Sequence, residues 1–318
     1  MTGENITEIT IIGAGMAGLA CGRRLARAGL APVVLDKGRG IGGRIATRRA
    51  ALADGAASFD HGAQYVTAQS AGFAALLHDL GGAVSRWDDG TGKPHLVGVP
   101  GMSSLPRAMA AGIDVRSGVE VTALHRTAAG WDIVAGPQRL ATRRLVMAVP
   151  APQAAQLLGP GHEFAALLGG VAMAPCLTLM AAFAADAPRP FLTRASDSHP
   201  LAWIAQDSSK TGRNRALTTW VAQAGADWSM AHLEKEPAAI AAMMLPLLAE
   251  VIGAAPESAC HAAAHRWRYA HVTMPIGQAF MGSDDRRLYL GGDWCPGAGV
   301  EAAWRSGDAI ADDILAAG

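Results

Sequence analysis

The stretch ITIIGAGMAGLACGRRLARAGLAPVVLD, residues 9–36, decides the fold of this chain. Residues 9–12 form a short β-branched run, which is typical of a buried parallel strand. Residues 19–28 have a helical spacing of apolar side chains, and Gly29 is a natural stop for a helix. Residues 32–36 predict a second strand. A strand, a helix and a second strand in this order form a βαβ unit, so we expect an α/β domain with a parallel sheet.

The turn between the first strand and the helix carries the pattern G-x-G-x-x-G at Gly13, Gly15 and Gly18. Gly13 permits a tight turn, Gly15 lets a pyrophosphate approach the backbone, and Gly18 lets helix and strand pack closely. The helix N-terminus then offers N–H groups to phosphates. Asp36 stands eighteen residues after Gly18, where it can accept hydrogen bonds from ribose hydroxyls. The sequence therefore predicts a dinucleotide site.

Two further segments favour FAD over NAD. The block RGIGGR, residues 39–44, places a second glycine pair next to Arg44, which can hold a phosphate through two N–H groups. A plain NAD domain does not need this second clamp. Residues 291–293 read GGD after an apolar strand, and Asp293 could bond a ribityl or phosphate-side hydroxyl. A helix that begins at Val300 could favour negative charge on the pyrimidine edge of a reduced flavin.

The composition excludes several classes of protein. The 318 residues contain 27 Lys plus Arg and 27 Asp plus Glu, so the net charge is zero and gives no electrostatic case for nucleic acid or an anionic membrane. Half of the residues are hydrophobic and 17% are charged, which excludes a disordered chain. The length predicts two domains. Lysine is scarce, and the four lysines are Lys37, Lys93, Lys210 and Lys235.

Cysteine usage and hydropathy predict a cytoplasmic protein. The four cysteines form no C-x-x-C pair, so we expect free thiols in a reducing compartment and no metal site. These cysteines are Cys21, Cys176, Cys260 and Cys295. Residues 1–10 lack the basic and apolar regions of a signal peptide. Residues 164–185 are uncharged, but glycines and a proline interrupt them, so we expect a helix end, a turn and a strand rather than a membrane span. Residues 238–252 predict a helix with one buried face.

Together these motifs resemble the FAD-binding domain of the flavin monoamine oxidase superfamily, and within it the bacterial renalases. The resemblance covers nearly the whole chain. The strings DKGRGIGGR (36–44) and GGDWCPGAGVEAAWRSG (291–307) are similar to the superfamily in general. The strings GAQYVTA (62–68), HRWRYA (265–270) and GDWC (292–295) are similar to renalases in particular. Further supporting strings are PGMSSLPRAM (100–109), AVPAPQAAQLL (148–158) and TTWVAQAGADWS (218–229).

The resemblance implies an α/β fold in which a Rossmann-like FAD-binding domain, of the amine oxidase/p-hydroxybenzoate hydroxylase type, carries an inserted α+β substrate domain. We expect residues 1–70, 100–150 and 277–318 to form the discontinuous FAD-binding domain. We expect residues 71–99 and 151–276 to form the substrate domain. In the family the active site lies between the two domains.

The resemblance also assigns residues to FAD. Asp36 would hold the adenosine ribose, Arg44 the pyrophosphate, and the backbone of Val121 the adenine. The residues along the isoalloxazine would be Gly62, Ala63 and Gln64. The residues at the ribityl chain and the pyrimidine end would be Asp293, Val300 and Glu301. The turn residues that complete the predicted cofactor site are Gly13, Gly15, Ala17, Gly18, Lys37 and Gly43. Cys295 does not match the position at which some relatives tether the flavin, so we expect non-covalent FAD.

The activity that the resemblance implies is oxidation of the 2- and 6-dihydro isomers of NAD(P)H, with hydride transfer to flavin N5 and reduction of O2 to H2O2. A dihydropyridine is already a hydride donor, so no side-chain base is required. The alternative is an amine oxidase or a related flavin desaturase. Amine oxidases place a lysine near N5 late in the substrate domain and an aromatic residue just before the final Glu-Gly-Ala. Here no lysine follows Lys235, and Gly299 and Val300 precede Glu301.

The candidate substrate-pocket residues are Gln64, Tyr65, His265 and Trp267, and no catalytic side chain is assigned. His265 could bond a carboxamide or be structural, and Trp267 could be core or a stacking wall. On a strand, Arg266 would face away from His265. We expect a structural His61, because GAQY needs a close backbone approach there. The expected partners are the small-molecule substrate and O2, with no nucleic acid and no membrane. A flavoprotein without turnover and an NAD-only dehydrogenase stay open, as do the oligomeric state and the preference for NAD or NADP isomers.

Overall fold

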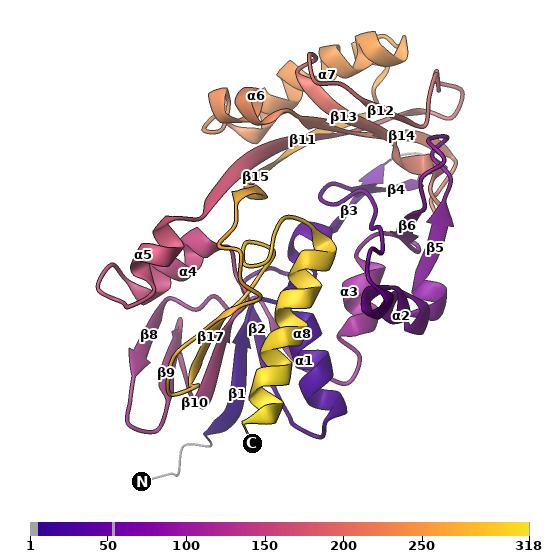
Figure 1. The fold of residues 1–318 in the computed structure, drawn as a ribbon. Coiled ribbons are helices and arrows are strands. Elements are labelled where there is room, and N and C mark those ends of the chain that lie inside the picture. The colour runs from indigo at the N-terminus through magenta and orange to yellow at the C-terminus, as the bar shows by residue number, and fades with distance from the viewer. Residues whose placement is uncertain (1–5, 53–54, 318) are drawn as a thin grey trace. The chain divides into compact units, whose positions relative to one another are not determined.

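The computed structural model describes residues 6–52 and 55–317, and Figure 1 shows their ribbon. The described residues divide into two compact units, each with a hydrophobic core of its own. Unit 1 comprises residues 1–43, 106–173 and 272–318, and unit 2 comprises residues 44–105 and 174–271.

An eight-stranded sheet forms the centre of unit 1. Its strands are β1 (Thr7–Ile12), β2 (Val33–Asp36), β7 (Asp114–Ser117), β8 (Ala123–Arg126), β9 (Trp131–Ala135), β10 (Gln138–Met147), β16 (Met281–Gly282) and β17 (Leu288–Leu290). The order β17-β10-β1-β2-β7 is parallel throughout. β16 and β9 extend it through antiparallel pairs, and β8 pairs with β9. The apolar runs of β1 and β10 fit a sheet that is covered on both faces.

Two long helices of unit 1, α1 (Met16–Arg27) and α8 (Val300–Ala316), lie side by side (Figure 1). Their backbones come close at Gly307 on α8, where a Cβ would lie 1.9 Å from the carbonyl oxygen of Ala17. Arg24 also pairs with Asp308 at 3.3 Å, but both side chains are partly solvent-exposed and such pairs contribute little. The glycine contact therefore sets the distance between the two helices.

The main core of unit 1 includes buried side chains of α4 (Ala151–Leu158) and α5 (Ala165–Gly169). Ala151 and Leu168 belong to the same buried cluster as Met147 at the end of β10. The fully buried Trp294 joins this cluster, and its Nε1 donates to the carbonyl of Val149 at 3.0 Å. This bond fixes the glycine-rich segment after β17 against the segment that follows β10.

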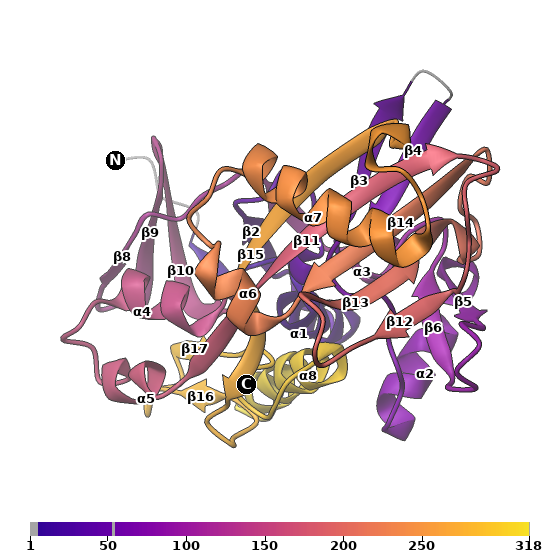
Figure 2. The ribbon, with the colours of Figure 1, turned by 90° about the horizontal axis from the view of Figure 1, so that it is seen from above.

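Unit 2 is built on a five-stranded sheet. Its strands, in spatial order, are β12 (Thr193–Ala195), β13 (Leu201–Gln206), β14 (Leu217–Ala224), β11 (Ala172–Ala184) and β15 (His261–Met274). The helices α6 (Ala226–Ala231) and α7 (Pro237–Ile252) lie over one face of the sheet (Figure 2). Alternate residues of β11 share this face, so Leu179 and Phe183 pack in one core cluster with Met244 of α7.

The other set of alternating residues on β11 packs on a hairpin. The hairpin consists of β3 (Thr47–Leu52) and β4 (Gly55–Asp60). Met180 of β11 and Val221 of β14 share a buried cluster with Phe59 of β4. The remaining elements are α2 (Ala71–Asp79), the hairpin β5 (Val84–Trp87) and β6 (His95–Gly98), α3 (Ser104–Met109), and the short 3-10 turns η1 (Gly43–Ile45), η2 (Gly81–Ala83), η3 (Asp207–Ser209) and η4 (Pro256–Ser258).

The predicted fold class is confirmed, since β1, α1 and β2 form the expected βαβ unit of a mixed α/β chain. The expected helix end, turn and strand within residues 164–185 appear as α5 and β11, and the expected helix over 238–252 appears as α7. Val119 and Val121 lie in the connection before β8, where the N–H of Val119 donates to the carbonyl of Asp36 at 2.9 Å.

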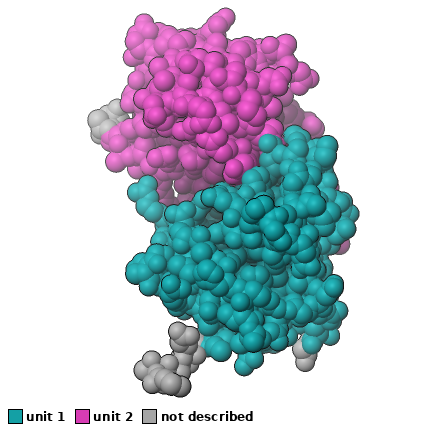
Figure 3. Space-filling model, turned by 90° about the vertical axis from the view of Figure 1, so that its left-hand side faces the viewer, with its two compact units in different colours: residues 1–43, 106–173, 272–318 teal, residues 44–105, 174–271 magenta. Residues whose placement is uncertain are grey.

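The two units, coloured separately in Figure 3, have boundaries that differ from the expected domain boundaries. Residues 44–70 lie in unit 2, because the β3–β4 hairpin packs on β11 and β14. Residues 151–173 lie in unit 1, because α4 and α5 pack on its core. A compact unit is not the same as a functional domain, so the division into FAD-binding and substrate domains stays a prediction.

No helix within residues 6–52 and 55–317 is both long and apolar enough to cross a membrane. The expectation about a signal peptide concerns residues 1–10, of which residues 1–5 lie outside the described part of the chain.

Replacing Gly307 by Ala should lower the free energy of unfolding by about 1–3 kcal/mol, the usual range for overpacking. The added Cβ would meet the Ala17 carbonyl oxygen at 1.9 Å, so α1 and α8 would have to separate. Gly169→Ala in α5 is a matched control, because nothing lies within 4 Å of a Cβ there. Urea unfolding compares the variants, and equal stability of Gly307→Ala and Gly169→Ala would contradict the close contact.

Candidate functional site

In the first glycine turn of unit 1, Gly13 and Gly18 pack closely against the neighbouring backbone, whereas the position of Gly15 at the start of α1 is open. Gly13 has φ of +107°, and a Cβ there would lie 2.6 Å from the carbonyl oxygen of Ala148. A Cβ on Gly18 would lie 1.9 Å from the carbonyl oxygen of Gly13. Gly15, the N-cap of α1, has nothing within 4 Å of its Cβ position. The open N-terminus of α1 thus fits a phosphate of the predicted dinucleotide.

Asp36 ends β2 beside this turn and organises it. Its Oδ2 accepts a hydrogen bond from the N–H of Ala14 at 2.6 Å, and its Oδ1 accepts one from the N–H of Gly38 at 2.7 Å. Each carboxylate oxygen keeps a second lone pair, so the half-buried side chain can also accept from a ribose hydroxyl. Lys37, the next residue, is exposed.

The second glycine segment lies against the first. The N–H of Gly42 donates to the carbonyl of Ala14 at 2.8 Å, and a Cβ on Gly43 would lie 3.6 Å from the Cα of Gly15. Two glycine turns of unit 1 are therefore adjacent, as two contacts with one pyrophosphate would require. In unit 2, Nη1 of Arg44 donates to the carbonyl of Ala270 at 3.0 Å.

Four other predicted cofactor residues of unit 1 lie in three places. Val121 is buried in the connection before β8. Asp293, 4% exposed, follows β17, and its carbonyl accepts a hydrogen bond from the N–H of Gly297 at 3.0 Å. Val300 and Glu301 are half-buried in the first turn of α8. Unit 1 thus presents the N-termini of α1 and α8, to which the sequence assigned the phosphates and the flavin edge.

Residues 60–64 of unit 2 are held by neighbouring elements on several sides. A Cβ on Gly62 would lie 2.0 Å from the carbonyl oxygen of Arg44, and Ala63 donates its N–H to that oxygen at 2.8 Å. The carbonyl of His61 accepts a hydrogen bond from Nε1 of Trp267 at 2.7 Å. The carbonyl of Gly62 accepts one from Nε2 of Gln223 at 2.8 Å. The backbone of Gly62 thus lies directly against that of Arg44, with no room for a side chain between them.

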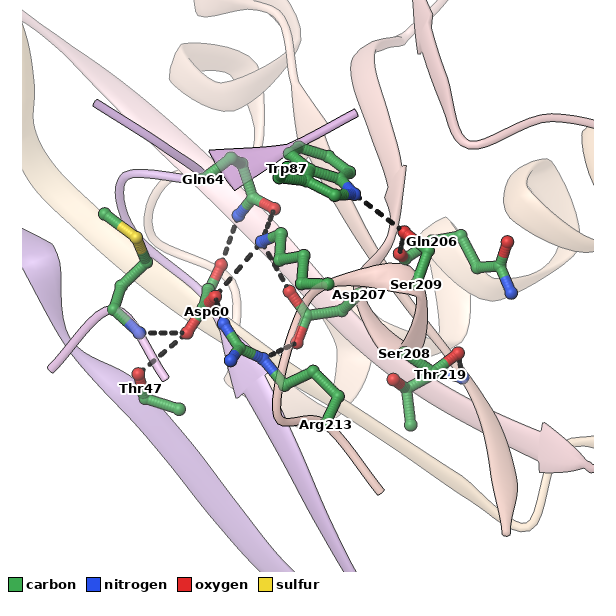
Figure 4. Close-up of polar contacts among 12 residues, drawn as sticks. Thr47, Asp60, Gln64, Trp87, Gln206, Asp207, Ser208, Ser209, Arg213 and Thr219 are labelled. Carbon is green, nitrogen blue, oxygen red and sulfur yellow. Dashed lines mark hydrogen bonds and ion pairs between the residues drawn. The ribbon is translucent and has the colours of Figure 1, made fainter. Parts of the chain in front are cut away.

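A buried cluster of charges lies beside this segment. Figure 4 shows Asp60, Gln64, Asp207 and Arg213 pointing toward one another. Nζ of Lys210 lies 3.1 Å from Asp60 Oδ2, 3.1 Å from Gln64 Oε1 and 2.6 Å from Asp207 Oδ1. Arg213 donates to Asp60, and its Nε lies 3.6 Å from Asp207 Oδ2. None of the four charged side chains is more than 7% exposed.

The two carboxyl groups of the cluster differ in their proton affinity. Burial would raise the pKa of Asp60, but Lys210 and Arg213 outweigh it and hold this pKa below its ordinary value. Bonds from the N–H of Met102 at 2.9 Å and the hydroxyl of Thr47 at 2.7 Å act in the same direction. Burial raises the pKa of Asp207, and the Asp60 charge adds to this effect against the opposing charge of Lys210.

The side-chain amide of Gln64 forms its hydrogen bonds with this cluster and with the neighbouring backbone. Its Nε2 donates to the carbonyls of Asp60 and Gly62, and its Oε1 accepts from Lys210. The side chain is 5% exposed. The geometry therefore does not support the prediction that this side chain lines a substrate pocket, because both ends of the amide are bonded inside unit 2.

Three aromatic rings of unit 2 form a wall along β15, consisting of His61, His265 and Trp267. Ring centroids lie 4.7 Å apart for His61 and His265, 4.3 Å for His265 and Trp267, and 5.1 Å for His61 and Trp267. Arg266 faces away as predicted, and its guanidinium donates to the carbonyl of Leu233. Nδ1 of His61 is buried and has no hydrogen-bond partner among the described residues.

Both histidines of the wall are held neutral. Burial, then the neighbouring His265 and the Arg48 charge, lower the pKa of His61 to about 4. Burial, followed by the charges of Arg48 and Arg266, lowers the pKa of His265 to about 4. At neutral pH the wall therefore carries no charge of its own.

Tyr65 belongs to a second aromatic group. Its ring stacks on His95 with centroids 3.6 Å apart, and the rings of Trp203 and Trp87 lie 5.9 and 6.5 Å away. Nδ1 of His95 lies 3.1 Å from Asp89 Oδ2. Burial raises the pKa of the half-buried Tyr65 phenol, and the Asp89 charge adds to this. The four predicted pocket residues thus belong to three different groups of side chains.

Sequence reasoning missed Asp207, Lys210 and Arg213. The one sequence feature that marks these residues is an acid followed by two bases within residues 207–213. Such a pattern is normally found in a solvent-exposed turn. No local pattern shows that this turn is buried against Asp60, about 150 residues earlier in the chain.

The structure describes all four cysteines. All four are free thiols. Burial raises the pKa of Cys295 to about 12, which disfavours the reactive thiolate. Within residues 6–52 and 55–317, no group of three or more His, Cys, Asp or Glu side chains is placed to hold a metal ion.

Acid should destabilise the protein through the two wall histidines. Their folded pKa of about 4 lies below the ordinary value of 6.5, so between these values the unfolded chain binds protons that the folded chain does not. The contribution of these two histidines to the free energy of unfolding is then fully present above pH 6.5 and is lost as the pH falls toward 4. Urea unfolding across this range should give a shallower pH slope for His61→Phe and His265→Phe. His125→Phe, at an exposed position of β8, is the control and should keep the wild-type slope.

Two family models match the chain. The model described as flavin containing amine oxidoreductase matches residues 83–315, which is more than half of the chain. The model described as NAD(P)-binding Rossmann-like domain matches residues 11–80, the part that includes the βαβ unit.

Solved structures of similar fold span the whole chain. A protein from Exiguobacterium sp. 255-15, provisionally named a protoporphyrinogen oxidase, has a TM-score of 0.78 at 13% identity, covering 99% of this chain and 100% of that one. Cyclohexylamine oxidase from Brevibacterium oxydans IH-35A has a TM-score of 0.76 at 14% identity, covering 98% and 100%. Putrescine oxidase bound to putrescine has a TM-score of 0.71 at 15% identity, covering 98% and 100%. At these identities the structures show a shared fold. The chain belongs to the flavin-containing amine oxidoreductase family, and its cofactor is non-covalent FAD.

Proposed function

We propose that this protein is a renalase-type FAD oxidase, which oxidises the 2- and 6-dihydro isomers of NAD(P)H to NAD(P)+. The observation that carries the proposal is the burial of Lys210. Its ammonium group has three N–H donors, and three protein oxygens accept from it, on Asp60, Gln64 and Asp207. This lysine therefore has no donor left for a water or an amine.

The other lysines do not supply an amine oxidase site either. Lys37, Lys93 and Lys235 are exposed. Two of the three tyrosines are engaged elsewhere: Tyr289 is fully buried and donates to Asp313 at 2.8 Å, and Tyr65 stacks on His95. A cage of the kind that amine oxidases use needs aromatic faces turned to the amine.

The wall of His61, His265 and Trp267 suits a neutral hydride donor. A dihydronicotinamide ring becomes positively charged as its hydride leaves, so a cationic side chain beside it would oppose the reaction. Both imidazoles are kept neutral, and the indole offers a face that favours a cation.

The predicted cofactor residues are proposed to bind FAD in the roles that the resemblance implied. Gly13, Gly15 and Gly18 would hold the phosphates, Asp36 the ribose, and the segment 62–64 the isoalloxazine. The remaining members of the set are Ala17, Lys37, Gly43, Arg44, Val121, Asp293, Val300 and Glu301. When bound, FAD accepts the hydride and is reoxidised by O2. The balance is one dihydro isomer, one O2 and one proton giving NAD(P)+ and H2O2.

Amine oxidation, or desaturation by a related mechanism, is the second candidate, favoured by the family that the chain belongs to. We propose a small-molecule donor and O2 as partners in either case. Location in the cytoplasm stays a prediction from the cysteine pattern.

The choice of electron donor tests the proposed function. Purified protein should be yellow, and under anaerobic conditions its flavin should bleach rapidly with borohydride-made NADH isomers and slowly with ordinary NADH. Small primary amines serve as the competing donors in the same stopped-flow experiment. Rapid bleaching by an amine, with none by the isomers, would sink the proposal in favour of an amine oxidase.

Asp36→Ala should weaken FAD binding at least about tenfold, since a hydrogen bond to a charged group is worth about 1.5–3 kcal/mol. The flavin retained after gel filtration, measured by absorbance, reports the effect. Asp114→Ala is the matched control, because Asp114 is exposed on the neighbouring β7 and pairs with Arg116 at 2.7 Å. Full retention of flavin by Asp36→Ala would show that Asp36 is not a ribose ligand.

A further inference from the structure

We infer that Lys210 is a positioning residue for the segment 61–63, on which it acts through the amide of Gln64. The inference rests on one part of the proposed function, the placement of this segment along the flavin ring. It does not depend on which donor reduces the flavin.

Three successive carbonyls of the segment are bonded by side chains. Those of Asp60, His61 and Gly62 accept hydrogen bonds from Gln64, Trp267 and Gln223, respectively. In a trans peptide the following N–H points the opposite way from the carbonyl. The three side-chain donors therefore fix the direction of three peptide dipoles in a row. Fixed dipoles beside a redox group alter the relative stability of its charge states.

Gln64 can hold this arrangement because Lys210 fixes its other end. Oε1 of Gln64 accepts from Nζ of Lys210 at 3.1 Å, which orients the amide so that Nε2 faces the carbonyls of Asp60 and Gly62. Lys210 also excludes the flipped orientation of the Gln64 amide. In that orientation Oε1 would face the carbonyl oxygens of Asp60 and Gly62, and both hydrogen bonds would be lost. The ammonium itself is fixed by Asp60 and Asp207, at 3.1 and 2.6 Å.

The charged groups of the cluster would still be paired if Gln64 were absent. The role of Gln64 is therefore to connect the cluster to the segment, not to neutralise its charges. Asp60 also contacts Arg213, Thr47 and the N–H of Met102. Lys210 lies between the two carboxylates of Asp60 and Asp207 in any case. Gln64 is thus the link through which a rigid, buried cluster reaches the segment.

Gln64→Met tests the link while it leaves the ion pairs in place. Freeing even one residue of the segment is worth about a factor of ten in affinity for a ligand that must order it again. We therefore expect the FAD dissociation constant to rise at least about tenfold. A tenfold change in the relative affinity for oxidised and reduced flavin equals about 30 mV for a two-electron couple, and we expect a potential shift of this order with an altered visible spectrum.

Lys210→Met should give the same shifts, and the double variant should add nothing beyond Gln64→Met alone, because the lysine acts through the amide. Ser208→Ala is the matched control on η3: its hydroxyl accepts from the N–H of Thr219 at 3.2 Å, and it should lower the melting temperature without changing spectrum or potential. If Lys210→Met does not fold, Gln64→Met decides the question. Unchanged affinity, spectrum and potential in Gln64→Met would overturn the inference, whatever the donor panel shows.

Discussion

The carboxylate of Asp60 joins parts of unit 2 that are far apart in the sequence. It accepts hydrogen bonds from Thr47 on β3, from the N–H of Met102, and from Lys210 and Arg213 beyond η3. A fully buried carboxylate is tolerated only when such partners compensate for lost water. Removing one partner of a buried pair typically destabilises a protein by about 3–5 kcal/mol. The hairpin, the segment after β6 and the turn at η3 therefore depend on one side chain.

The same side chain stands at the start of the segment that carries the proposed chemistry. From Asp60 the chain continues to His61, whose ring joins the wall along β15, and to Gln64, whose amide returns to the charged cluster. Tyr65 then enters a separate aromatic group with His95. Residues 60–65 thus contribute both to the stability of unit 2 and to the proposed chemistry. Most substitutions in this segment would therefore affect stability and function together.

Local pattern was enough to predict the two ends of unit 1, but not that α4 and α5 belong to it. The βαβ unit, the adjacent glycine turns and the helix from Val300 follow from spacing within short windows, because hydrophobic periodicity and glycine turns are local signals. The cluster of Asp60, Asp207, Lys210 and Arg213 could not be predicted in this way, because its members meet only after unit 2 has folded. Gln64 shows the consequence: its place in the GAQY string suggested a pocket, but its hydrogen bond with Lys210 directs the amide inward.

The two units differ in how their charged and polar groups are partnered. Unit 1 has helix N-termini at Gly15 and Gly299, neither of which has a side-chain cap, and such ends attract anions such as phosphates. Unit 2 pairs its buried charges with one another and keeps His61 and His265 neutral. A cofactor with a pyrophosphate matches the first pattern. A reacting ring that is neutral before hydride transfer and cationic after it matches the second, because unpaired positive charge on the wall would stabilise the reactant relative to the product.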